Sequence, residues 1–116
     1  MKLEVGQFAR LKSGYICKII NINDFREPNM KYGVEANYLR DIMFIGDNDI
    51  AKASYNIIDI LEVGDYVNGV KVINIDDEWI IMSNMQVPIL KSIANGMIKS
   101  VITHEQMEQM EYKVGE

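Results

Sequence analysis

The sequence predicts a mainly β fold, a β-rich α+β protein in which two SH3-like β-hairpin units form one compact small barrel or sandwich, with one short C-terminal helix. Three observations lead to this prediction. Short segments rich in β-branched residues alternate with glycine turns, one block of sequence occurs twice, and a helix-start pattern lies near the C-terminus. A length of 116 residues suits a single domain over residues 1–116, large enough to fold without disulfides or a metal ion.

An internal repeat covers residues 3–24 and 61–77, and both copies begin with Leu-Glu-Val-Gly. The segment at residues 18–24 recurs at residues 71–77 with five of seven residues identical. The two blocks occur in the same order and differ only in the length of the turn between them. This pattern predicts a duplicated supersecondary unit.

Each copy of the repeat predicts a β-hairpin. A first strand carries an aromatic residue, Phe8 or Tyr66, a glycine turn reverses the chain, and a longer strand rich in isoleucine and valine returns. In the second copy Asn68 and Gly69 suit a two-residue type I′ turn, because both central residues of that turn need positive φ. The return strands are apolar on both faces, which favours a central position in a sheet.

The remaining elements follow from shorter patterns. Further strands are expected at residues 31–36, 41–45, 78–83 and 97–102, and an edge strand at residues 112–114. Residues 46–55 are expected to be turn-rich with one helical turn, and residues 84–96 to be irregular. Thr103 and Gln106 have the spacing of a capping box, so the helix is expected to start at Thr103 and to end near Met110.

The formal charge of −5 is unevenly distributed. Residues 1–58 hold eight Lys/Arg and seven Asp/Glu, a net charge of +1, whereas residues 59–116 hold four Lys and ten Asp/Glu, a net charge of −6. An acidic half argues against wrapping a nucleic-acid backbone, because that binding needs matched cations. It suits a partner that is itself basic.

The sequence predicts a cytoplasmic protein. Its single cysteine, Cys17, cannot form an internal disulfide, which fits a reducing compartment. No apolar leader follows the first residues, and no apolar run reaches the length of a membrane helix.

Catalytic chemistry has little support, and we expect neither enzymatic activity nor a cofactor. The chain has one histidine and one cysteine and no nucleophile or phosphate-binding motif. Cys17 aligns with Val70 in the repeat, which predicts a core position, and His104 is expected to be a solvated residue in the first helical turn. No metal site is predicted, since the segment at residues 47–49 resembles an EF-hand start but lacks the later ligands.

Acidic side chains are the favoured partner-binding residues. They would contact lysines and arginines on a basic protein, in the manner of phosphates. The residues are Asp76, Asp77, Glu78, Glu105, Glu108 and Glu111.

Two alternative functions remain open. The first is a sponge that sequesters a nucleotide immune signal in a basic pocket, for which the candidate ligand-binding residues are Arg10, Lys12, Tyr15, Lys18 and Tyr32. The second is an SH3- or OB-like nucleic-acid module, which ranks last because the aromatic residues lack an interleaved basic stripe.

The C-terminal third is rich in methionine, a residue that adapts its shape to interfaces. This predicts a homodimer. The residues expected to take part are Met97, Met107, Met110 and Tyr112.

The segments NIIDILEVGDYVNG at residues 56–69 and IKSVITHEQME at residues 98–108 resemble small uncharacterised proteins of phages and prophages of Gram-positive bacteria. The resemblance implies a viral protein of the host cell cytoplasm with a role in counter-defence. It implies a stoichiometric inhibitor of a host defence protein, of the anti-CRISPR type, that acts on a basic nuclease. It supplies no catalytic residue.

Overall fold

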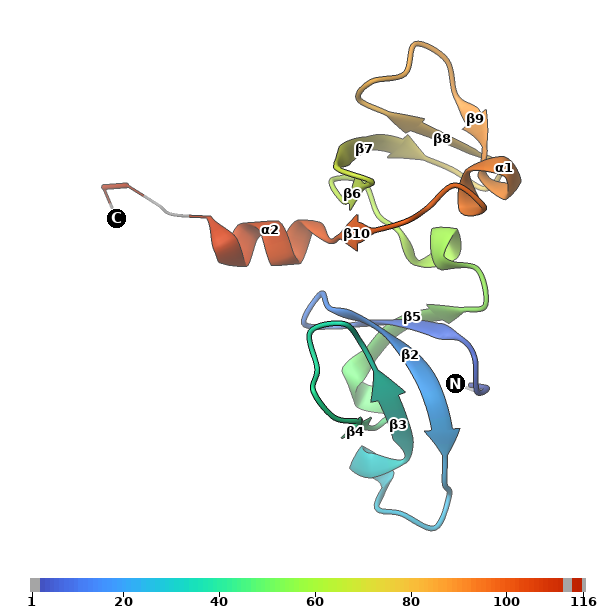
Figure 1. Cartoon of the computed structure of the whole chain (residues 1–116), viewed down its shortest axis with the longest axis vertical. Helices are drawn as coiled ribbons and strands as arrows, with labels where there is room; N and C mark the ends of the chain where they lie inside the picture. Colours follow the sequence, from blue (N-terminus) through green and yellow to red (C-terminus); the bar gives the residue numbers. More distant parts are fainter. Residues whose placement is uncertain (1–2, 112–113, 116) are drawn as a thin grey trace. The chain divides into compact units, whose positions relative to one another are not determined.

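A computed structural model describes residues 3–111 and 114–115 of the chain. Over these residues the protein is mainly β, as predicted, with ten strands in two five-stranded antiparallel sheets (Figure 1). The chain divides into two compact units, Met1–Ile60 and Leu61–Glu116, so that each unit contains one copy of the repeat. A single domain over residues 1–116 stays a prediction.

The first unit contains five strands and three 3-10 turns. The strands are β1 (Phe8–Leu11), β2 (Ile16–Ile22), β3 (Tyr32–Glu35), β4 (Met43–Ile45) and β5 (Ile50–Ser54). The 3-10 turns are η1 (Pro28–Met30), η2 (Asp47–Asp49) and η3 (Ile57–Ile60).

The second unit contains five strands and two helices over its described residues. The elements are β6 (Tyr66–Val67), β7 (Val70–Ile75), β8 (Trp79–Met82), β9 (Ile89–Leu90), α1 (Lys91–Asn95), β10 (Val101–Ile102) and α2 (His104–Met110).

Both sheets have the same strand order. The first is β4-β3-β2-β1-β5, and the second, followed in the same sense, is β9-β8-β7-β6-β10. In each, four consecutive strands form a meander, and the last strand returns to pair with the first. The likeness of the two units therefore extends beyond the hairpins to the whole of each sheet.

The Leu-Glu-Val-Gly segments have the same backbone structure in both units. Gly6 and Gly64 both have φ of 98°, a conformation that favours glycine. The Gly6 N–H donates to the Ile19 carbonyl at 2.8 Å, and the Gly64 N–H donates to the Val72 carbonyl at 2.9 Å. The next residue reinforces the turn, because Asp65 Oδ2 accepts a hydrogen bond from the Glu62 N–H at 2.7 Å, as Gln7 does in the first unit.

Equivalent positions of the two units are buried. Ile19 and Val72, which occupy equivalent positions on the return strands, are both fully buried. A register shift follows each of them, which indicates a β-bulge at the same point in both sheets. Cys17 lies within the apolar cluster of the first unit, as predicted.

The predicted hairpin turn and C-terminal helix are confirmed. Asn68 and Gly69 both have positive φ, as a type I′ turn requires. Thr103 Oγ1 accepts a hydrogen bond from the Gln106 N–H, and Gln106 Oε1 accepts one from the Thr103 N–H, so the capping box is formed. The helix ends at Met110.

Three local predictions were wrong at least in part. Residues 46–55 contain one helical turn, η2, as predicted, but the rest of the segment is the strand β5, since Ala53 and its neighbours pair with β1. Residues 84–96, expected to be irregular, include β9 and the short helix α1. The strand expected at residues 97–102 is confined to Val101 and Ile102. The edge strand expected at residues 112–114 falls largely outside the described residues.

Candidate functional site

The turn between β7 and β8 carries three consecutive acidic residues. Asp76 Oδ1 accepts hydrogen bonds from the backbone N–H groups of Trp79, at 2.7 Å, and Glu78, at 2.9 Å. These bonds lower the pKa of the Asp76 carboxyl group, because they stabilise its charged form. Asp76 therefore fixes the turn, while Asp77 and Glu78 are exposed.

Trp79 follows this turn directly and is 41% exposed. Its side chain forms a wall of two neighbouring hollows, and Pro88 also borders both. The larger hollow, of about 520 Å³, is mainly apolar and is lined by Trp79, Met85, Gln86, Val87, Pro88, Ile89, Leu90 and Ile93. The smaller one, of about 150 Å³, is lined by Asn74, Asp76, Trp79, Ile81 and Pro88.

This arrangement combines exposed apolar area with fixed negative charge. Val87, Leu90 and Ile93 are all exposed around the larger hollow. A contiguous apolar surface of this kind marks an interaction site more often than a scattered exposed residue does. Because Asp76 lines the smaller hollow and belongs to the acidic turn, the surface suits a partner segment with both apolar and basic side chains.

Of the three C-terminal glutamates proposed to bind a partner, Glu105 and Glu108 lie in α2 and are near His104, and Glu111 caps the end of the helix. His104 Nε2 lies 2.9 Å from Glu105 Oε1 and 2.9 Å from Glu62 Oε1. Glu108 Oε1 lies 3.7 Å from His104 Nδ1. Glu111 is exposed and, with Glu108, borders a hollow of about 760 Å³ beside α2.

The sequence predicted that His104 is a solvated residue in the first helical turn. In the structure it is instead half-buried among carboxylates. Sequence reasoning also missed Glu62, which is 42 residues away from His104. The available signal was the position of Glu62 in the repeated Leu-Glu-Val-Gly segment. The sequence gives no sign of the hollow at Trp79, because the hollow depends on the β8–β9 loop, which has no clear pattern.

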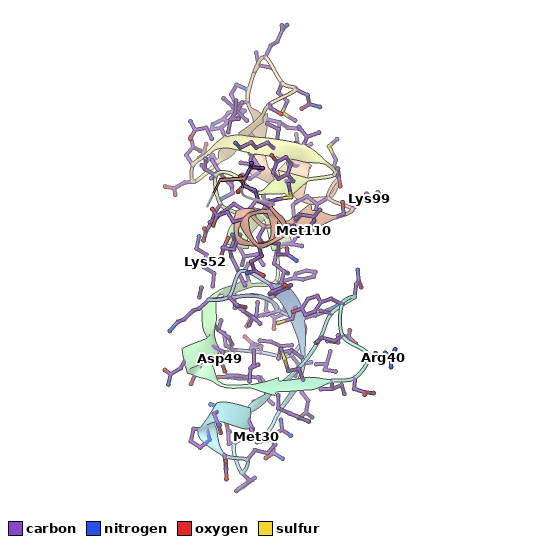
Figure 2. The ribbon with its side chains drawn as sticks, turned by 90° about the vertical axis from the view of Figure 1, so that its left-hand side faces the viewer. Met30, Arg40, Asp49, Lys52, Lys99 and Met110 are labelled. Atoms are coloured by element: carbon purple, nitrogen blue, oxygen red, sulfur yellow. The ribbon has the colours of Figure 1, made fainter. Side chains whose placement is uncertain are left out.

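The methionines proposed for self-association differ in exposure. Met97 is 56% exposed, and Met110, labelled on α2 in Figure 2, is 71% exposed. Met107 is half-buried and borders the hollow beside α2. Tyr112 lies outside the described residues.

The residues proposed for a nucleotide pocket are only partly accessible. Arg10 is fully buried and donates to the Ile60 carbonyl at 3.1 Å. Tyr32 is also buried, and its hydroxyl donates to Asp47 Oδ1 at 2.6 Å. Lys12 and Lys18 are exposed, and Tyr15 packs against Tyr38 with ring centroids 4.9 Å apart. In this structure the two buried side chains serve the interior of the first unit, and a ligand does not reach them.

No family model, curated protein or solved structure matches the chain. Within the described part of the chain, no helix has both the length and the apolar character needed to cross a membrane.

Proposed function

We propose that this chain is a non-catalytic binding protein whose second unit contacts a basic protein partner through Trp79 and the acidic turn beside it. In the form that the phage resemblance suggests, it is a stoichiometric inhibitor of a host defence protein, of the anti-CRISPR type, with a basic nuclease as its target. The observation that carries the proposal is the position of an exposed aromatic side chain between two hollows, directly after a rigid acidic turn.

Charge supports the choice of a basic partner. Residues 61–116 hold nine Asp/Glu and four Lys, a net charge of −5, whereas residues 1–60 hold eight of each sign and are neutral. Opposite charge on the partner would speed association and orient it on the surface. The apolar wall would supply the burial that surface charge pairs lack, because exposed ion pairs contribute only about 0–1 kcal/mol each.

Binding can be measured through the fluorescence of Trp79, since it is the only tryptophan in the chain. We expect its fluorescence to change when a soluble peptide of alternating leucine and arginine is added, and to stay constant with a peptide of leucine and glutamate. The double variant Asp77→Lys with Glu78→Lys should weaken binding of the basic peptide at least tenfold and reduce its dependence on salt, because screening acts on the charges that it reverses.

The matched control is Glu27→Lys with Asp41→Lys, which makes the same change of charge at exposed positions of the first unit. Binding to the control should remain within about twofold of the unmodified chain. Equal weakening by both double variants would show that net charge alone governs binding, and would contradict a site at Trp79.

The inhibitor form is tested by titrating the chain into a panel of RNA-guided nucleases, whose nucleic-acid channels are positively charged. We expect cleavage by the target to stop at one equivalent of protein, and the Asp77→Lys, Glu78→Lys variant to lose this effect. Full cleavage by every nuclease at excess protein would reject this form and leave the peptide-binding result to be judged separately.

A further inference from the structure

His104 sits where three parts of the second unit meet. It begins α2, and its backbone N–H donates to Asp65 Oδ1 at 2.9 Å, which ties the helix start to the turn of the Leu-Glu-Val-Gly segment. Glu62 of that segment and Glu105 of the helix approach the same ring nitrogen, Nε2, from two different elements, each at 2.9 Å. All three side chains are partly buried, with 24–33% exposed.

The geometry points to a divalent transition-metal site, for Zn²⁺ by preference, with Glu62, His104 and Glu105 as its protein ligands. Their donor atoms, one nitrogen and two oxygens, all lie within 4.8 Å of one another. A tetrahedral zinc ion with bonds of about 2.0–2.1 Å holds its ligands about 3.4 Å apart. Small side-chain rotations are enough to reach that spacing, and the ion would take the place between the three atoms.

The donor set selects the type of ion. Two carboxylates alone suit Mg²⁺ or Ca²⁺, which take oxygen ligands. An imidazole nitrogen at the centre of the set favours Zn²⁺ and its neighbours Co²⁺ and Ni²⁺ instead. Two carboxylates also neutralise the charge of a divalent ion, so that binding places no net charge in a partly buried site.

The surroundings match what metal-binding histidines need. On the far side of the ring, Glu108 Oε1 lies 3.7 Å from His104 Nδ1. This is too far for a hydrogen bond, but a small rotation of the exposed Glu108 side chain would let it accept the Nδ1 proton and orient the imidazole, as second carboxylates do at metal-binding histidines. His104 also borders the hollow of about 760 Å³ beside α2, which gives the ion a route from solvent. Three protein ligands leave a fourth position for water or for a ligand in that hollow.

The first unit provides an internal comparison. There Glu4 occupies the position of Glu62, and burial together with the nearby Glu4 carboxylate raises the pKa of the Tyr55 hydroxyl. Tyr55 lies 3.5 Å from where a Cβ on Gly6 would be, as His104 lies 3.3 Å from that place on Gly64. Each unit therefore places a glutamate and a ring at this position, but among the described residues only the second unit offers an imidazole and a second carboxylate there. The inference does not depend on the proposed function.

The test is titration of the full chain with ZnCl₂, and with CoCl₂ as a spectroscopic probe. We expect Zn²⁺ to raise the melting temperature and to shift the ¹⁵N resonance of His104 Nε2, while Mg²⁺ and Ca²⁺ do neither. Co²⁺ should give the visible absorption of a tetrahedral nitrogen–oxygen site. Glu62→Gln and Glu105→Gln should each weaken zinc binding at least tenfold, and His104→Asn should abolish the Co²⁺ spectrum.

Glu4→Gln is the matched control, because it changes the equivalent residue of the first unit and should leave zinc affinity within about twofold. Glutamine keeps the size of glutamate, so that the variants retain the fold, which circular dichroism checks. An unshifted His104 resonance at saturating Zn²⁺ would overturn the inference, and would assign the three contacts to hydrogen bonding of a protonated imidazole only. Zinc binding that is equally weakened by Glu4→Gln would overturn it as well.

Discussion

Some polar residues of this protein stabilise the fold within a unit, whereas others are exposed and available for binding. Asp76 and Asp65 are acidic, but each accepts backbone hydrogen bonds that fix a turn, so their role in the molecule is structural. Asp77 and Glu78 lie beside Asp76 with exposed side chains. Sequence reasoning grouped Asp76, Asp77 and Glu78 together, because residue type alone does not reveal which carboxylate is used by the turn.

Cys17 illustrates the first group and gives a chemical prediction. Its side chain is buried on β2, its thiol lies 3.7 Å from the Ala9 carbonyl, and burial raises its pKa to about 11. The thiolate is the reactive form, so the thiol should be inert at neutral pH in the folded chain. We expect a disulfide reagent such as Ellman's reagent to modify Cys17 at least a hundredfold more slowly in buffer than in denaturant.

The two rates are compared at the same pH with free cysteine as the reference. Modification of the folded chain at a rate near that of free cysteine would mean that Cys17 is reached by solvent, and would contradict its place in the core.

At the scale of elements, local patterns sufficed where a few neighbouring residues determine the backbone. The type I′ turn at Asn68 and the capping box at Thr103 are of this kind, and both are formed. Strand β5 is different, because Ile50–Ser54 owes its extended form to pairing with β1, which lies about forty residues earlier in the chain. The hollow at Trp79 depends on the β8–β9 loop in the same way.

The junction of β4 with η2 provides a prediction at this scale. Gly46 is buried, and a Cβ added there would lie 2.3 Å from the Pro28 carbonyl oxygen and 2.8 Å from Asn29 Cα. Both contacts are with backbone, so η1 would have to move. We expect Gly46→Ala to lower the free energy of unfolding by about 3 kcal/mol, the upper part of the range for overpacking.

Gly96→Ala is the control, since Gly96 has right-handed helical dihedrals and the nearest atom to an added Cβ is 3.7 Å away. Its effect should be within about 0.5 kcal/mol of zero or slightly stabilising. Urea unfolding of both variants measures this difference in the free energy of unfolding. Equal stabilities would show that η1 can move to accept the added Cβ without loss of stability.

At the scale of the whole molecule, the composition and the repeat predicted more than the single patterns did. The mainly β class and the duplicated hairpins are confirmed. The sequence did not indicate that each copy extends to a complete five-stranded sheet, because the later strands of the two units share no sequence pattern. Ile89 and Ile45 occupy corresponding places beside Ile80 and Tyr32, yet the segments around them share no recognisable pattern.

Self-association remains a prediction for the whole chain. Met97 and Met110 expose apolar surface in the second unit, and a second copy of the chain would cover it in a closed two-fold dimer. We expect light scattering to give a mass near twice 13.3 kDa at high concentration, falling on hundredfold dilution. Met110→Lys should favour the monomer. Val87→Lys should not, because Val87 is equally exposed but lines the larger hollow beside Trp79. A constant mass of one chain at every concentration would reject the dimer.

The repeated turn at Gly6 and Gly64 gives this protein an internal reference. The same backbone hydrogen bonds hold both turns, so any property that the scaffold alone confers must be observed twice in one polypeptide. A property observed in one unit only must come from residues in which the two units differ. Isotope-edited spectra of the paired positions, recorded in a single sample, would therefore separate the two kinds of property without a second protein for comparison.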